Sequence, residues 1–168
     1  LEAKNLRAFS FFIPKGKDPA DYKNEVMDRL GKMLDVIRGS GVTFCHENEK
    51  GIYGDIASRC KDLLDHFGGR LGCIFDPANF IQCGEQPLDN FALLKDKIEY
   101  MHIKDALPNG SVVPPGEGIG NVPVLLEKFA AVVRFCDSLC YHRLRLLFLC
   151  LDGHAAWSGS CFHDGAVD

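Results

Sequence analysis

Three side chains that are able to bind a metal ion recur along this 168-residue sequence, each about one strand-and-helix unit after the last. They are Glu47, Asp76 and His102, and each lies within or just beyond a short apolar segment. Two carboxylates and one imidazole form a ligand set that suits a divalent cation such as Mn, Mg, Co or Zn. If the three side chains meet, the sequence predicts a metal site.

Each of these residues also has a plain structural explanation. An Asp that precedes Pro, as Asp76 precedes Pro77, commonly ends a strand as a turn or cap residue. A His inside an apolar segment, such as His102, is commonly a half-buried residue whose ring is hydrogen-bonded. Glu47 shares a polar run with Glu49 and could belong to a solvated loop. The pattern alone leaves the metal site and the structural explanation equally open.

The elements that must position these side chains alternate between strands and helices. Short apolar runs predict buried strands over residues 6–13, 42–45, 71–75 and 100–103. Apolar residues at helical spacing predict helices that begin at Asp18 and Asp55, which can cap them, and further helices over 87–97 and 122–133. This alternation predicts a parallel sheet with right-handed crossovers, whose strands end at one edge, where ligands bind.

Composition limits the class of protein. Lys and Arg total 19 against 23 Asp and Glu, and the resulting net charge of −4 disfavours nucleic-acid binding. No stretch approaches the roughly 18 apolar residues of a membrane span, and the first residues do not form a signal peptide. The absence of an initiator Met indicates that the chain begins inside a longer protein. We interpret Cys45, Cys60 and Cys73, at apolar positions, as reduced core residues of a cytoplasmic protein.

The composition changes near residue 129. No Lys or Glu follows Lys128, yet half of the Cys and half of the His residues do. We therefore divide the chain into a domain over residues 1–130 and an atypical Cys- and His-containing tail over 131–168. The tail sequence is either divergent or translated from a shifted reading frame. No pair of tail residues has C-x-x-C spacing, so a zinc site there is disfavoured.

A Gly-rich segment over residues 116–120 precedes the last predicted helix. It lacks the G-x-G-x-x-G spacing and does not directly follow a strand, so a dinucleotide site is disfavoured. A flexible turn is the favoured interpretation, and a loop that helps to hold a sugar or phosphate group is the functional alternative.

Five segments resemble, in order, the sugar phosphate isomerase/epimerase family of xylose-isomerase-like TIM barrels over roughly residues 6–129. They start at Arg7, His46, Phe75, Tyr100 and Gly116, with the sequences RAFSFF, HENEKGIYGD, FDPANF, YMHIKD and GEGIGN. The family fold is a parallel (β/α) barrel of eight strands. The resemblance implies that this α/β chain holds about the C-terminal half of the barrel, strands four to seven, followed by the atypical tail.

The resemblance also implies a site. The family holds its metal with Glu, Asp, His and a last Glu at successive strand ends, and the first three map onto Glu47, Asp76 and His102. Asn79 and Lys104 map onto substrate-binding positions. The implied activity is a divalent-metal-dependent isomerase or epimerase of a small sugar or sugar phosphate. Glu47 would take a proton from the carbon beside the carbonyl, and an enediolate would form.

The last Glu of the family pattern is missing. It is expected near residues 138–144, which contain no Glu, and Asp152 is a weak substitute. The alternative function is therefore a catalytically inactive half-barrel fragment or an interaction module. Such a half-barrel has two unpaired sheet edges, which a homo-oligomer would cover. Among enzymes, an inositol-pathway dehydratase or isomerase is a further alternative, while the net charge disfavours a DNA-repair endonuclease.

Overall fold

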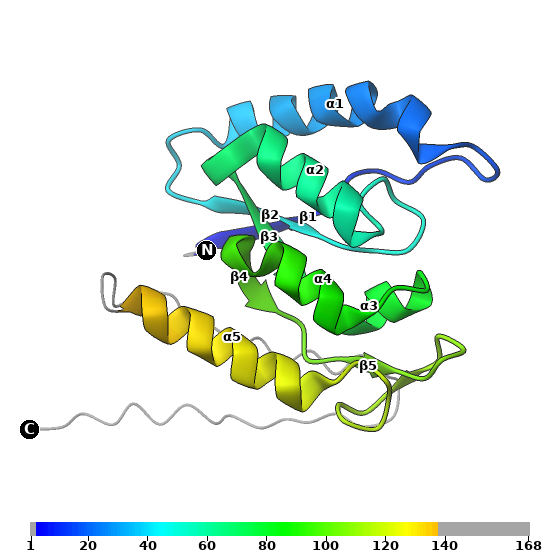
Figure 1. Cartoon of the computed structure of the whole chain (residues 1–168). Helices are drawn as coiled ribbons and strands as arrows, with labels where there is room; N and C mark the ends of the chain where they lie inside the picture. The colour runs from blue at the N-terminus through cyan, green and yellow to red at the C-terminus, as the bar shows by residue number, and fades with distance from the viewer. Residues whose placement is uncertain (1–2, 138–168) are drawn as a thin grey trace, which may run out of the picture.

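The computed structural model describes residues 3–137 of the chain, and its centre is a four-stranded parallel sheet (Figure 1). The strands are β1 (Asn5–Ala8), β2 (Thr43–Glu47), β3 (Leu71–Phe75) and β4 (Ile98–Met101). They lie in the sheet in chain order, and each neighbouring pair is parallel. The predicted α/β class is thereby confirmed, and the described sheet is an open part of a barrel.

Helices connect the strands and cover one face of the sheet (Figure 1). They are α1 (Lys23–Val36), α2 (Ala57–Phe67), α3 (Pro77–Gln82), α4 (Pro87–Leu94) and α5 (Val122–Asp137). Short 3-10 helices over Pro19–Tyr22, Gly68–Arg70 and Lys95–Lys97 precede α1 and follow α2 and α4. Within residues 3–137, no helix has both the length and the apolar character that a membrane crossing requires.

Alternation along the strands decides which side chains face the helices. Phe44 and Phe75 join a large buried apolar cluster that includes Leu63 of α2. Neighbouring side chains of a strand point to opposite faces of the sheet. A separate buried cluster accordingly consists of Cys45, Ile74 and Tyr100. The predicted metal ligands Glu47, Asp76 and His102 each lie two positions after a member of this second cluster. They therefore lie on the same face of the sheet as that cluster.

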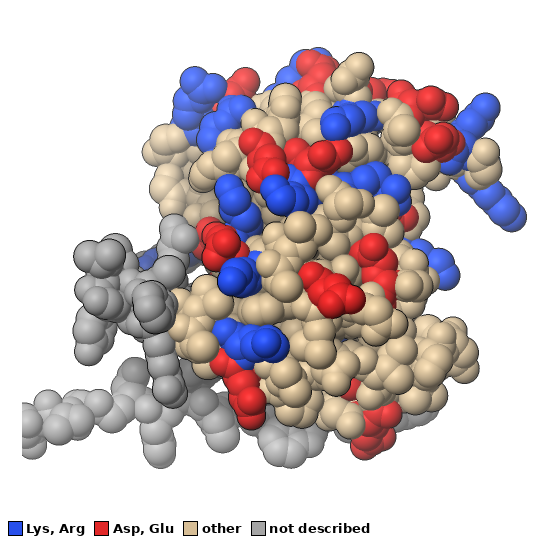
Figure 2. Space-filling model, viewed as in Figure 1, with Lys and Arg blue, Asp and Glu red and all other residues tan. Residues whose placement is uncertain are grey.

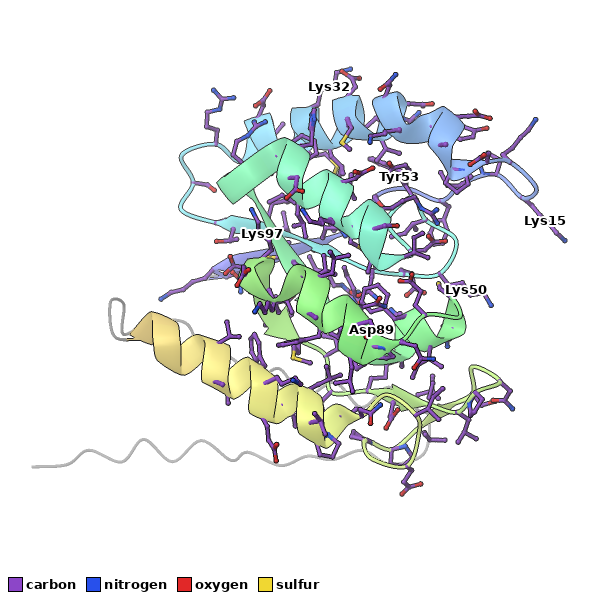
Figure 3. The ribbon with its side chains drawn as sticks, in the orientation of Figure 1. Lys15, Lys32, Lys50, Tyr53, Asp89 and Lys97 are labelled. Carbon is purple, nitrogen blue, oxygen red and sulfur yellow. The ribbon has the colours of Figure 1, made fainter. Side chains whose placement is uncertain are left out.

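Acidic and basic side chains are interspersed over the helical face of the molecule (Figure 2). On α1, the ion pairs Glu25–Arg29 and Asp28–Lys32 each join residues one helical turn apart. Lys15 points away from the body of the protein (Figure 3). Exposed pairs of this kind contribute about 0–1 kcal/mol each, so the fold depends mainly on the apolar cluster beneath them.

The first strand is shorter and more exposed than the sequence predicts. The prediction of a buried strand over residues 6–13 is wrong, because β1 ends at Ala8, its one buried residue. Ser10 instead points into the protein, where its hydroxyl lies 2.9 Å from His46 Nε2 and accepts the N–H of Gly54 at 2.8 Å. These two contacts draw the chain away from the direction of the strand.

Of the two predicted helix caps, one is confirmed and one is wrong. Asp18 accepts a backbone N–H at 2.9 Å at the start of the 3-10 helix before α1. Asp55 does not cap α2, because its carboxylate pairs with Arg59 one turn further on. The N–H of Ala57 donates instead to Glu85 Oε2 at 2.6 Å. A side chain that is distant in sequence therefore caps α2.

Two short elements were not predicted. Helix α3 has six residues, too few to show helical periodicity in the sequence. Strands β5 (Asp105–Ala106) and β6 (Val112–Val113) form a small antiparallel hairpin between the predicted strand over 100–103 and the predicted helix over 122–133. Both elements follow directly on site residues and therefore shape the region around them.

Candidate metal centre

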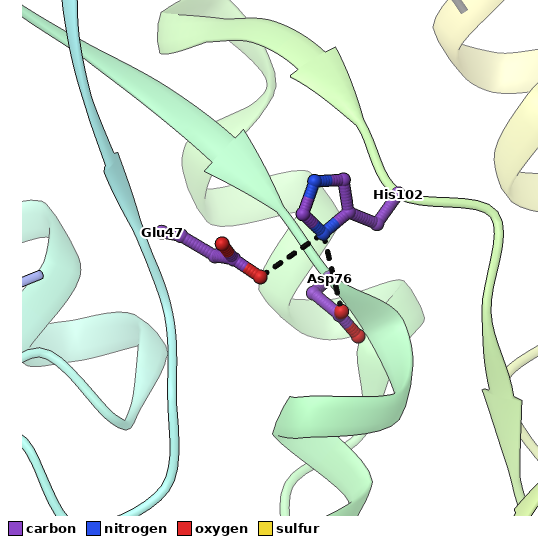
Figure 4. Close-up of side chains that lie close together, drawn as sticks. All are labelled: Glu47, Asp76 and His102. Carbon is purple, nitrogen blue, oxygen red and sulfur yellow. Dashed lines mark ion pairs between the residues drawn. The ribbon is translucent and has the colours of Figure 1, made fainter. Parts of the chain in front are cut away.

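Glu47, Asp76 and His102 lie together at the carboxyl end of the sheet (Figure 4). Glu47 is the last residue of β2, Asp76 directly follows β3, and His102 directly follows β4. Because these strands are parallel neighbours, their ends bring the three side chains to one place. The structure therefore assembles the three residues that the sequence singles out as metal ligands.

The spacing of the three side chains fits a single ion. His102 Nδ1 lies 3.0 Å from Glu47 Oε1 and 3.4 Å from Asp76 Oδ2. One ligand atom from each residue lies within 4.8 Å of the other two. Metal–ligand bonds of about 2.1 Å place adjacent ligand atoms about 3.0–3.4 Å apart in octahedral or tetrahedral geometry. All three residues are at most 5% exposed, so the donor set and its spacing suit a divalent cation.

In the metal-free protein, the imidazole of His102 binds a proton between the two carboxylates. Burial lowers the pKa of His102, but the hydrogen bonds and negative charges of Asp76 and Glu47 outweigh it and raise the pKa to about 9. Near pH 7 the ring is therefore an imidazolium whose Nδ1–H faces both carboxylates. A divalent cation would replace that proton between the same three groups.

A basic side chain accompanies each carboxylate. Arg7 of β1 donates from a guanidinium nitrogen to Glu47 Oε2 at 3.0 Å. Lys104 Nζ lies 3.3 Å from Asp76 Oδ2 and donates to Asn79 Oδ1 at 2.7 Å. Asn79 and Lys104, which the family resemblance marks as substrate-binding positions, thus lie directly beside the second carboxylate.

Asp76 also caps helix α3. Its Oδ1 accepts the backbone N–H of Asn79 at 3.0 Å, while Oδ2 faces His102. Asp76 is therefore both a helix cap and a candidate metal ligand. The cap fixes one oxygen of the carboxylate and so orients the other toward the imidazole.

The Gly-rich segment wraps around Asp105, a fully buried carboxylate. Asp105 accepts the N–H groups of Gly116, Gly118 and Gly120 at 3.0, 3.1 and 2.8 Å. The loop that the sequence predicts as a flexible turn is thus hydrogen-bonded to Asp105 at three of its glycines. These three N–H groups are directed at Asp105, which leaves them no part in holding a sugar or phosphate group.

Arg7 and Asn48 are the site residues that sequence reasoning missed. Arg7 is paired in register with Cys45, so strand alternation could have placed it on the face of the site. Asn48 directly follows Glu47, and no periodic pattern marks it, because its contacts are with the backbone of Asp76.

Most of the tail predicted over residues 131–168 lies outside the described residues, and only 131–137 are described, as the end of α5. The expected position of a fourth ligand near 138–144 and its substitute Asp152 also lie outside them.

The family model of the xylose isomerase-like TIM barrel matches residues 3–133. The chain therefore belongs to the xylose isomerase-like TIM barrel family, and the resemblance found in its five segments is confirmed. A search for a curated relative by sequence gives no significant match.

Several solved structures share the fold. A D-tagatose 3-epimerase-like protein aligns with a TM-score of 0.67 at 17% identity, over 77% of this chain and 52% of its own. An IOLI protein solved with a zinc atom aligns with a TM-score of 0.63 at 19% identity, over 77% and 50%. A family 2 AP endonuclease from Brucella melitensis aligns with a TM-score of 0.59 at 14% identity, over 77% and 51%. The chain spans about half the length of these structures.

Proposed function

We propose that this chain carries the metal centre of a sugar isomerase or epimerase that acts on a small sugar or sugar phosphate in the cytoplasm. The convergence of Glu47, Asp76 and His102 at one edge of the sheet is the observation that supports this most strongly. The ion would be Mn, Mg, Co or Zn, given two carboxylates and one imidazole. The zinc atom in the IOLI protein and the epimerase-like neighbour agree with this proposal.

The residues around the ion have distinct tasks in this proposal. A bound divalent cation supplies a Lewis acid that polarises a substrate carbonyl and acidifies the neighbouring C–H. Glu47 is the base that removes this proton, and Arg7 fixes the orientation of its carboxylate. Lys104, whose side chain is 25% exposed, and Asn79 are the groups available to hydrogen-bond substrate oxygens.

A second function is favoured by the open sheet. Strand β1 lies at the edge of the sheet, and three of its four residues are exposed. Unpaired edges of this kind invite pairing with another chain. A catalytically inactive half-barrel that associates with itself or a partner is therefore the alternative, and metal-dependent chemistry separates the two functions.

Mn²⁺ titration of the wild-type chain and two variants tests the metal centre. Asp76→Asn and His102→Ala should abolish tight binding, because each removes one of three ligands. Asn is also a good helix cap, so Asp76→Asn should keep α3 intact. Asp62→Asn is the matched control, since its carboxylate pairs with Lys23 on the helical face. Unchanged isotherms in both site variants would refute the assignment.

Exchange of a substrate C–H proton with deuterium oxide tests the chemistry. A panel of ketoses with Mn²⁺ should show exchange, and Glu47→Gln should slow it by about 10²–10⁴-fold, the usual effect of losing a general base. Tight Mn²⁺ binding without exchange on any ketose would favour the inactive half-barrel.

A further inference from the structure

Asn48 lies where the backbone pairing of the two carboxylate-bearing strands ends. Strands β2 and β3 are paired up to Glu47 and Ile74. Beyond this pair, β3 continues for one residue, Phe75, and Asp76 then precedes helix α3, so the regular pairing of β2 with β3 does not continue. Asn48 directly follows Glu47 and is only 1% exposed.

The side-chain amide of Asn48 takes the place of the missing backbone pair. Its Nδ2 donates to the carbonyl oxygen of Asp76 at 2.9 Å, and its Oδ1 accepts the N–H of Asp76 at 2.9 Å. One side chain thus pairs with both the N–H and the carbonyl oxygen of Asp76 in a buried setting, where an unsatisfied group costs about 1–3 kcal/mol. The carbonyl oxygen also accepts the N–H of Phe80 at 3.4 Å. Any shift of the Asp76 backbone relative to Glu47 would strain both hydrogen bonds with Asn48.

The backbone of Asn48 extends this network to the other side of the site. Its carbonyl oxygen accepts from Asn79 Nδ2 at 2.8 Å, which orients Asn79 Oδ1 toward Lys104. Both polar atoms of the Asn48 side chain are occupied by Asp76. Asn48 is therefore placed to act through these neighbours and not as a ligand itself.

We propose that Asn48 is a positioning residue that sets the separation of the Glu47 and Asp76 carboxylates and so determines the affinity and geometry of the metal centre. The proposal rests on the metal centre proposed above. Partners of metal ligands typically alter metal affinity by about 10- to 100-fold when they are removed.

Metal binding by Asn48→Ala tests this role. The variant should bind Mn²⁺ at least about tenfold more weakly than the wild type. The visible absorption spectrum of the Co²⁺-loaded variant should also differ, because that spectrum reports coordination geometry, which a loss of stability alone does not change. Asn90→Ala is the matched control. Asn90 is buried on α4 and donates to Glu85, away from the site. It should lower stability and leave Mn²⁺ affinity and the Co²⁺ spectrum unchanged.

Asn48→Gln answers the same question if Asn48→Ala fails to fold. It keeps the amide group but adds one methylene, so it should shift Asp76 and change the Co²⁺ spectrum while retaining the fold. A folded variant at position 48 with the affinity and spectrum of the wild type would overturn the positioning role alone. A wild-type chain that binds neither Mn²⁺ nor Co²⁺ would overturn the metal centre, and the positioning role with it.

Discussion

Arg7 and Glu47 are joined across two neighbouring strands, with Arg7 Nη1 donating to Glu47 Oε2 at 3.0 Å while the other Glu47 oxygen faces His102. Arg7 is paired in register with Cys45, so Arg7 and Glu47 lie on the same face of the sheet. The Glu47 side chain is 4% exposed and that of Arg7 is 48% exposed. The contact therefore fixes which of the two Glu47 oxygens is directed at the imidazole.

Arg7→Met is expected to weaken Mn²⁺ binding by about tenfold, since it removes a hydrogen-bond partner of a proposed ligand. Thermal stability should change little, because a half-exposed ion pair contributes about 1 kcal/mol or less and Met keeps the apolar stem. Calorimetric titration with Mn²⁺ measures the effect. Arg38→Met, which breaks an exposed ion pair with Asp35, is the control. Equal affinity in Arg7→Met and wild type would contradict the role of this contact.

Mn²⁺ binding should strengthen as pH rises toward 9. The pKa of His102 is raised to about 9 in the metal-free protein, so the ion must displace a proton at lower pH. Affinity should rise by up to about tenfold per pH unit between 7 and 9 and then level off. Calorimetry in buffers of different ionisation enthalpy should detect proton release on binding at pH 7. His66→Gln, an exposed position on α2, should behave as wild type, whereas a pH-independent wild-type affinity would contradict the prediction.

Acid should destabilise the protein through His46. Burial lowers the pKa of this imidazole to about 3, while the unfolded chain takes up the proton near pH 6.5. The contribution to stability is therefore complete above pH 6.5 and is lost as pH falls toward 3, by about 2 kcal/mol at pH 5. Urea unfolding at pH 7 and pH 5 measures this loss. His46→Gln should start less stable, since it disturbs the contact with Ser10, but lose about 2 kcal/mol less on acidification. An unchanged acid sensitivity in that variant would count against His46 as its source.

Much of the fold follows from features that are local in the sequence. Apolar runs and helical periodicity predict β2, β3, α1, α2 and the parallel order, and Cys45, Cys60 and Cys73 are buried as expected. The same reasoning fails where distant residues compete with local pattern. Ser10 turns the chain out of β1 through contacts with residues 46 and 54, and Glu85 caps α2 in place of Asp55.

The three candidate ligands could be predicted because their positions depend on strand alternation and strand order, which can be inferred from the sequence. The residues that support them could not be predicted in the same way. Asn48 matters through hydrogen bonds to the backbone of Asp76, which is 28 residues away. Asp105 is the last residue of the segment YMHIKD, yet its role depends on how the Gly-rich loop over residues 116–120 closes around it. Such roles depend on tertiary contacts, which no local pattern encodes.

Gly118→Ala is expected to lower the free energy of unfolding by about 1–3 kcal/mol, the usual cost of overpacking a filled site. A Cβ at Gly118 would collide with the carbonyl oxygen of Ala106 and with the carboxylate of Asp105, which accepts the Gly118 N–H at 3.1 Å. Gly69→Ala is the matched control, because a Cβ there meets no atom within 4 Å and the residue has no positive φ. Urea unfolding of both variants measures the difference. Similar stability of the two would show that the loop around Asp105 adapts to a side chain, and that its glycines are not needed for close packing.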